Sequence, residues 1–186
     1  MKYIKHLKTI TKHKLYVMKF CFKCGQYKRG LLHDLSKFGP TEFFSSAKYY
    51  TGTSSPIDAE KKEKGYSLAW QHHKGRNPHH WEYWIDNLGT YANTPCEIPY
   101  NYMIEMLCDW LAAGIVYSKV KPDYNKGYSG PFDYYTKGRK YYILHPRTKR
   151  LVEGFLWIIK EYGINEFCRV AKSLKEKEIY EISNKF

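Results

Sequence analysis

Apolar residues recur at helical spacing along most of this chain, and this pattern is the strongest constraint on its fold. Between Tyr3 and about Phe22 the apolar positions lie three to five residues apart, with lysines between them, as in an amphipathic helix: Ile4, Leu7, Ile10, Leu15, Met18 and Phe22. A second clear stripe runs from Tyr100 to about Lys119. No segment alternates apolar and polar residues strongly enough to predict a sheet. The sequence therefore predicts an all-α protein.

Glycine and proline divide the chain into further helices. Gly25 is placed to end the first one, and we expect others over about 27–37, 41–50, 57–73, 79–88, 148–162 and 165–182. Residues 121–142 are rich in tyrosine, glycine and proline, and we expect an ordered aromatic loop there. The 186 residues should form one domain, with a core at about 3–119, the aromatic loop within 120–147 and C-terminal helices at 148–183.

The charge of the chain indicates an anionic partner. Lysine and arginine number 31 against 18 aspartates and glutamates, which gives a net charge of +13. Because the lysines are spread along the chain, we favour a small anionic substrate over nucleic acid. The sequence has no apolar run of about 18 residues, so we expect no membrane partner. An odd number of cysteines favours the reducing cytoplasm, and the single CxxC pair of Cys21 and Cys24 does not predict a zinc site.

Histidine and aspartate gather at positions that suit a metal site. His33 and Asp34 are adjacent at the end of an apolar run, where they can face one ion from two sides. Asp109 interrupts an apolar stripe, where a buried carboxylate costs several kcal/mol unless it is paired or binds metal. Four more histidines lie close together: His72, His73, His79 and His80. Imidazole and carboxylate ligands together favour zinc, iron, manganese, cobalt or nickel, so we expect one or two divalent ions of this kind.

The order of these residues resembles the HD-domain superfamily of metal-dependent phosphohydrolases. That family has a first His on one helix, a His-Asp doublet on the next, commonly followed by a small residue and Lys, and a final Asp on a later helix. The matching positions are His13, the doublet His33-Asp34 before Ser36-Lys37, and Asp109, and members with a second metal insert two histidines where 72–80 lies. The resemblance covers about 6–119. It is closest to an uncharacterised subgroup, often found in phages and Firmicutes, whose mark is Trp70, His73, Asn77, His79, His80, Trp81 and Trp84.

The resemblance implies a helical bundle with a C-terminal helical extension, and a metal-bound water that hydrolyses a phosphate ester of a nucleotide or nucleotide-derived signal. The implied ligands are His13, His33, Asp34 and Asp109, together with His73 and either His79 or His80. The remaining histidine would be a hydrogen-bond partner or an acid/base group. Asp34, Lys37 and His80 would act in catalysis. The substrate would be bound by Lys37, Arg76 and Asn77, and the aromatic loop would stack a base or cover the pocket.

Two other functions fit the same residues. Some all-α relatives with this ligand pattern hold two irons and oxidise small organic substrates with dioxygen. Alternatively, the metal would be structural and the basic surface would bind nucleic acid without catalysis.

Overall fold

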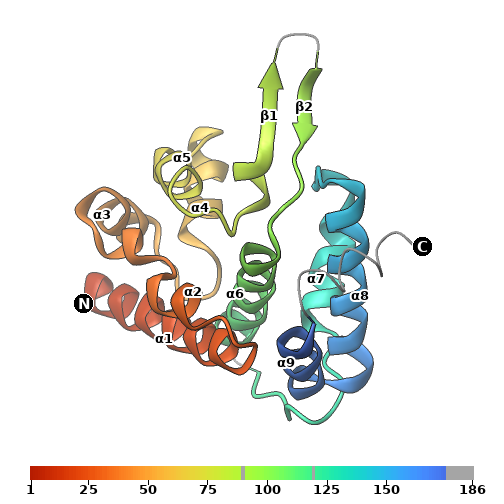
Figure 1. The fold of residues 1–186 in the computed structure, drawn as a ribbon. Coiled ribbons are helices and arrows are strands. Elements are labelled where there is room, and N and C mark those ends of the chain that lie inside the picture. Colours follow the sequence, from red (N-terminus) through yellow and green to blue (C-terminus); the bar gives the residue numbers. More distant parts are fainter. Residues whose placement is uncertain (89–90, 119, 175–186) are drawn as a thin grey trace.

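The computed structural model describes residues 1–88, 91–118 and 120–174, and these are mostly helical (Figure 1). The α-helices are α1 (Lys2–Lys23), α2 (Tyr27–Leu32), α3 (Pro40–Tyr49), α4 (Pro56–Lys64), α5 (Leu68–Lys74), α6 (Tyr100–Ser118), α7 (Gly130–Gly138), α8 (Pro146–Tyr162) and α9 (Ile164–Ser173). Short 3₁₀ turns are η1 (Leu35–Phe38), η2 (Trp81–Trp84) and η3 (Arg139–Tyr141). The predicted all-α fold is confirmed. Among the described helices, none has the length and apolar character needed to cross a membrane.

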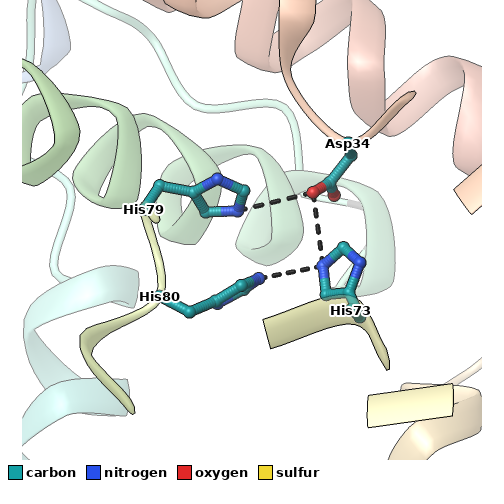
Figure 2. A group of neighbouring side chains, drawn as sticks. All are labelled: Asp34, His73, His79 and His80. Atoms are coloured by element: carbon teal, nitrogen blue, oxygen red, sulfur yellow. Dashed lines mark hydrogen bonds and ion pairs between the residues drawn. The ribbon is translucent and has the colours of Figure 1, made fainter. Parts of the chain in front are cut away.

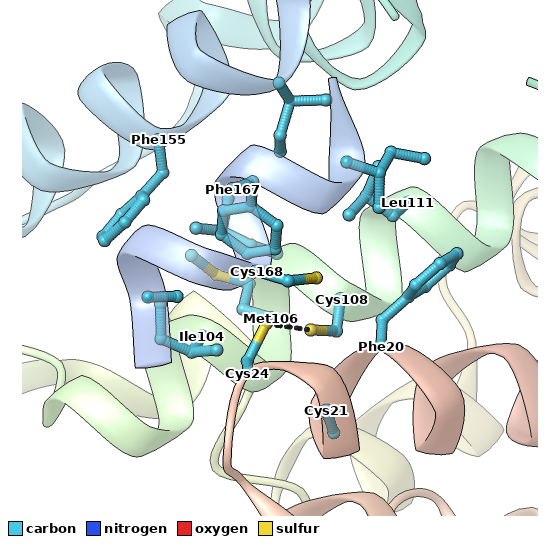
Figure 3. Packing of buried hydrophobic residues seen from close by; sticks show 14 of the residues in the cluster. Phe20, Cys21, Cys24, Ile104, Met106, Cys108, Leu111, Phe155, Phe167 and Cys168 are labelled. Carbon is cyan, nitrogen blue, oxygen red and sulfur yellow. Dashed lines mark hydrogen bonds between the residues drawn. The ribbon is translucent and has the colours of Figure 1, made fainter. Parts of the chain in front are cut away.

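Helix α6 runs through the middle of the hydrophobic core. Its buried face, which includes Leu111, packs between Phe20 of α1 and the aromatic side chains Phe155 of α8 and Phe167 of α9 (Figure 3). Most residues of α6 are buried, and only a few of them are polar. A helix that is apolar on most of its sides is typical of a protein interior. The C-terminal helices α8 and α9 therefore complete the same core that α1 and α6 begin.

Of the predicted apolar stripe of α1, only Ile10 is buried. Ile4 and Leu15 are 61% and 54% exposed, and Leu7 and Phe22 are also exposed. The face that packs inward is instead made of His6, Ile10, His13, Val17, Phe20 and Cys21. The buried face was not evident from hydropathy because it contains two histidines, His6 and His13. Both histidines are buried in the interior.

Two helices that the spacing predicted as continuous are broken. The segment expected at 27–37 ends after Leu32 and resumes as η1, with Asp34 in the left-handed region at a φ of 53°. The segment expected at 57–73 divides into α4 and α5 at Gly65, which has a φ of 80°. The last predicted helix, 165–182, corresponds to α9 up to Ser173, and its part beyond residue 174 lies outside the described residues.

Two expectations about irregular and sheet structure are wrong. The helix predicted at 79–88 is replaced by η2 and an antiparallel hairpin of β1 (Ile85–Leu88) and β2 (Tyr91–Pro95), which stands away from the helices at the top of Figure 1. No alternating pattern marked this hairpin, since both Asp86 and Thr94, which face each other in the register, are exposed. The expected loop at 121–142 contains α7, which begins at Gly130-Pro131 and buries Tyr135.

Candidate metal centre

Five separate parts of the fold bring histidine and aspartate side chains to one place. Helix α1 contributes one histidine, the break between α2 and η1 contributes a His-Asp pair, α5 and the loop after it contribute three histidines, and α6 contributes an aspartate. These residues are His13, His33, Asp34, His73, His79, His80 and Asp109. The structure thus brings together all the predicted ligands, and Figure 2 shows four of them.

Asp34 lies at the centre of this cluster. Its left-handed backbone conformation is rare for residues other than glycine, but aspartate and asparagine tolerate it better than most. Its Oδ1 atom is 3.3 Å from His73 Nε2 and 3.4 Å from His79 Nε2 (Figure 2). Its Oδ2 atom is 3.2 Å from His33 Nε2. One carboxylate therefore faces two sets of histidines with its two oxygens.

The two sets could each hold one cation. In the first, His13, His33, Asp34 and Asp109 converge, with His13 Nε2 and Asp109 Oδ1 2.8 Å apart. In the second, Asp34 meets His73, His79 and His80, and the Nε2 atoms of His73 and His80 are 2.9 Å apart. Within each set the potential ligand atoms lie within 4.8 Å of one another. Two ligand sets that share a carboxylate are an arrangement suited to a pair of ions.

Several of these buried atoms have no hydrogen bond. His33 Nε2, His79 Nε2 and Asp34 Oδ1 are fully covered, and their contacts of 3.2 to 3.4 Å within the cluster are ion pairs without hydrogen-bond geometry. Buried polar atoms are nearly always hydrogen-bonded in folded proteins, so such a group needs a reason. The two imidazole nitrogens lie 3.2 to 3.7 Å from carboxylate oxygens of Asp34 and Asp109. Nitrogen and oxygen ligands of a divalent metal have this arrangement, and the residues therefore fit a metal.

Two glutamates that were not among the predicted site residues orient the histidines. Glu105 Oε1 is 2.9 Å from His33 Nδ1 and 3.2 Å from His79 Nδ1. Glu42 Oε2 is 2.7 Å from His73 Nδ1, and its Oε1 is 2.6 Å from His72 Nδ1. A carboxylate on Nδ1 fixes the ring and leaves Nε2 free for a metal. Glu105, like Asp109, is a carboxylate on an apolar helix, so the same cost of burial marks it in the sequence.

The centre carries an excess of buried negative charge. The carboxylates of Asp34, Glu42, Glu105 and Asp109 are all buried. Burial alone would raise the pKa of Asp34 and Asp109, but neighbouring histidines, and for Asp34 also Lys37, outweigh it and hold both pKa values below the usual range. For His33, burial would lower the pKa, but the charges of Asp34 and Asp109 and the hydrogen bond with Glu105 raise it instead. The site therefore favours positive charge, whether protons on imidazole or metal ions.

The predicted substrate-binding residues lie in different surroundings. Lys37 Nζ is 2.6 Å from Asp34 Oδ2, and the side chain is 26% exposed. Asn77 is buried and donates from Nδ2 to the backbone oxygen of His73 at 2.8 Å, which holds that histidine in position. Arg76 is exposed and donates to the backbone oxygen of His72 at 3.3 Å. Of the three, Lys37 lines the cavity beside the metal centre.

Comparison with protein-family models places the chain in a family but assigns it no activity. Residues 2–157 match a family of unknown function, DUF5662. The chain belongs to this family. The match covers all of the candidate ligands, together with Glu42 and Glu105. No curated protein and no solved structure matches the chain.

A cavity of about 520 Å³ opens onto the metal centre. Its lining includes the ligands His13, His73, His80 and Asp109, the lysines Lys37 and Lys61, and the aromatic residues Trp70, Trp81, Trp110, Tyr117, Tyr134 and Tyr142. The last two come from the segment predicted to be an aromatic loop. Cavities of this size accommodate a small organic ligand. The arrangement can therefore place a ligand with an anionic end at the metals and a flat end against aromatic rings.

Proposed function

We propose that this protein is a metal-dependent phosphohydrolase whose substrate is a nucleotide or a nucleotide-derived phosphate ester. The observation that carries the proposal is the sharing of Asp34 between two histidine-rich ligand sets on the wall of a cavity that also contains Lys37. The resemblance to the HD-domain superfamily rests on the same residues. The five free cysteines accord with a reducing, cytoplasmic setting.

The donor set fits a divalent transition metal such as manganese, iron, cobalt, nickel or zinc. His13, His33 and Asp109 would hold one ion, His73, His79 and His80 the other, and Asp34 would contact both. When bound, such ions would supply Lewis acidity that polarises a phosphoryl oxygen and activates water for attack on phosphorus. The Glu42 and Glu105 carboxylates keep the imidazole rings aimed at this point.

Lys37 supplies positive charge at the cavity wall. Burial would lower its pKa, but the charges of Asp34 and Asp109 outweigh that effect and raise the pKa, so the ammonium group stays charged at neutral pH. A fixed cation beside the metals stabilises the negative charge that develops on the phosphoryl oxygens during hydrolysis. Lys61 adds a second cation to the cavity. A lysine beside Asp34 and a second lysine on the cavity wall favour an anionic substrate over the small organic substrate of an oxygenase.

The test is phosphate release after metal loading. Protein stripped with chelator and loaded with Mn²⁺, Fe²⁺, Co²⁺, Ni²⁺, Zn²⁺ or Mg²⁺ should hydrolyse 4-nitrophenyl phosphate or nucleoside monophosphates. Asp34→Asn should abolish the activity. Glu166→Gln, which removes the same charge from the exposed surface of α9, should retain the activity. Bound metal without phosphate release from any of these esters would overturn the proposal. Substrate-dependent oxygen uptake by the iron-loaded protein would support the oxygenase instead.

A further inference from the structure

We propose that Glu82 is the residue that selects the base of the nucleotide and that the base is guanine. This inference rests on the proposed function, because it assumes that the phosphate lies at the metal centre. Glu82 belongs to η2 and lines the same cavity as the ligands. It follows His80 by two residues, which places the two Cα atoms no more than about 7 Å apart. A ligand that contacts the metals at His80 can therefore reach Glu82.

The carboxylate of Glu82 has an unused acceptor. Its Oε2 atom is buried, and no donor among the described residues forms a hydrogen bond with it. Unlike the orphaned atoms of the metal centre, this oxygen belongs to none of the ligand groups identified there. A covered acceptor without a partner is costly, and a donor on a bound ligand removes that cost. A donor on a ligand in the cavity that Glu82 lines would supply the missing hydrogen bond.

Aromatic rings line the cavity that Glu82 also lines. The ring centroids of Trp81 and Tyr142 are 5.7 Å apart, those of Trp110 and Tyr142 are 5.4 Å apart, and those of Trp110 and Tyr134 are 6.3 Å apart. All four rings line the cavity, so they form a continuous aromatic wall. Nucleobases stack on such surfaces, and each stacked base contributes about 1–3 kcal/mol of binding free energy.

The chemistry of a carboxylate distinguishes among the bases. An ionised carboxylate accepts hydrogen bonds and donates none. Guanine presents two neighbouring N–H donors, at N1 and at the 2-amino group, which match the two oxygens of one carboxylate. Adenine and cytosine place a ring-nitrogen acceptor beside their amino group, and uracil places carbonyl oxygens on both sides of its N–H. Glu82 therefore favours guanine and disfavours the other bases.

The inference is tested with ligands that do and do not carry phosphate. Calorimetric titration should show guanosine binding at least tenfold more tightly than adenosine, with or without metal, because the nucleoside lacks the phosphate. With the metal-loaded protein, kcat/KM for GMP should exceed that for AMP at least tenfold, and IMP, which lacks the 2-amino group, should lie between them. Glu82→Gln should reduce both preferences to within threefold, whereas Glu166→Gln should leave both unchanged.

The two proposals fail in different ways. Equal hydrolysis of GMP and AMP by the wild-type protein, or an unchanged preference in Glu82→Gln, would refute base selection and leave the phosphohydrolase intact. A guanosine preference that depends on Glu82 without any phosphate release would support base selection and overturn the hydrolysis. Because each preference is a ratio measured within one protein sample, partial unfolding of a variant does not change it.

Discussion

The contact of Glu105 with two imidazole rings makes a quantitative prediction about metal affinity. One oxygen, Oε1, lies 2.9 Å from His33 Nδ1 and 3.2 Å from His79 Nδ1, and the residue is 3% exposed. These two histidines belong to different ligand sets, so one carboxylate orients a ring in each. Glu105→Gln keeps the shape of the side chain and a carbonyl acceptor but removes its charge. The substitution therefore tests charge-assisted orientation without creating a cavity.

The size of the effect follows from the two contacts. A hydrogen bond to a charged group contributes about 1.5–3 kcal/mol, and one between neutral groups about 0.5–1.5 kcal/mol. Loss of the charge at both contacts should cost about 2 kcal/mol of metal-binding free energy. That corresponds to roughly thirtyfold weaker binding, which agrees with the roughly 10- to 100-fold losses seen when outer partners of metal ligands are changed.

Competition with a chromophoric chelator at neutral pH measures this change for Mn²⁺, Co²⁺ and Zn²⁺. Glu166→Gln is the matched control, since that glutamate pairs with Arg169 at the surface of α9 and contacts no ligand. Its metal affinity should equal that of the wild-type protein. A Glu105→Gln affinity within threefold of wild type, in a protein that melts normally, would refute the reasoning, because the rings would then need no anionic partner.

Three further predictions concern metal content, pH and backbone conformation. Asparagine tolerates the left-handed backbone at position 34, so Asp34→Asn should fold but bind neither ion, whereas His13→Ala should lose one ion. Metal analysis by mass spectrometry measures the number of ions bound. Burial and, secondarily, a nearby lysine lower the pKa of His6 from 6.5 to about 4, so the unfolded chain binds its proton more readily and stability falls as the pH drops through that range. His6→Phe should remove about 2 kcal/mol of the stability lost between about pH 7 and about pH 4.5 in urea unfolding, and an unchanged loss would contradict this. Gly163→Ala should cost about 3 kcal/mol or more, because φ is 90° and the new Cβ would lie 2.6 Å from a carbonyl oxygen, whereas Gly65→Ala, with open space around it, should cost about 1 kcal/mol. Equal melting temperatures of the two alanine variants would show that the close approach is not rigid.

Local sequence patterns were sufficient for most helices and for the identity of the candidate ligands. Helical spacing depends on neighbours three and four residues apart, so α6 and α8 were predicted close to their observed ends. A buried carboxylate or a histidine pair on an apolar background is costly without a partner, which is why local context alone predicts His33, Asp34 and Asp109 as ligands. The same cost applies to Glu105, whose place on the apolar stripe of α6 carries an equivalent signal.

Tertiary packing decided the rest, because it depends on partners distant in sequence. On α1 two stripes compete for the interior, and packing against α6 selects the one that contains His13. The predicted role of Arg76 beside the substrate depends on a turn whose direction no local pattern specifies, and the structure leaves it exposed. Glu42 reaches His73 only because α3 packs beside α5. The sequence by itself determined that this chain is helical and which residue types could bind a metal. Only the folded chain determined that Asp34 faces two ligand sets at once, because that convergence requires five separated segments to meet.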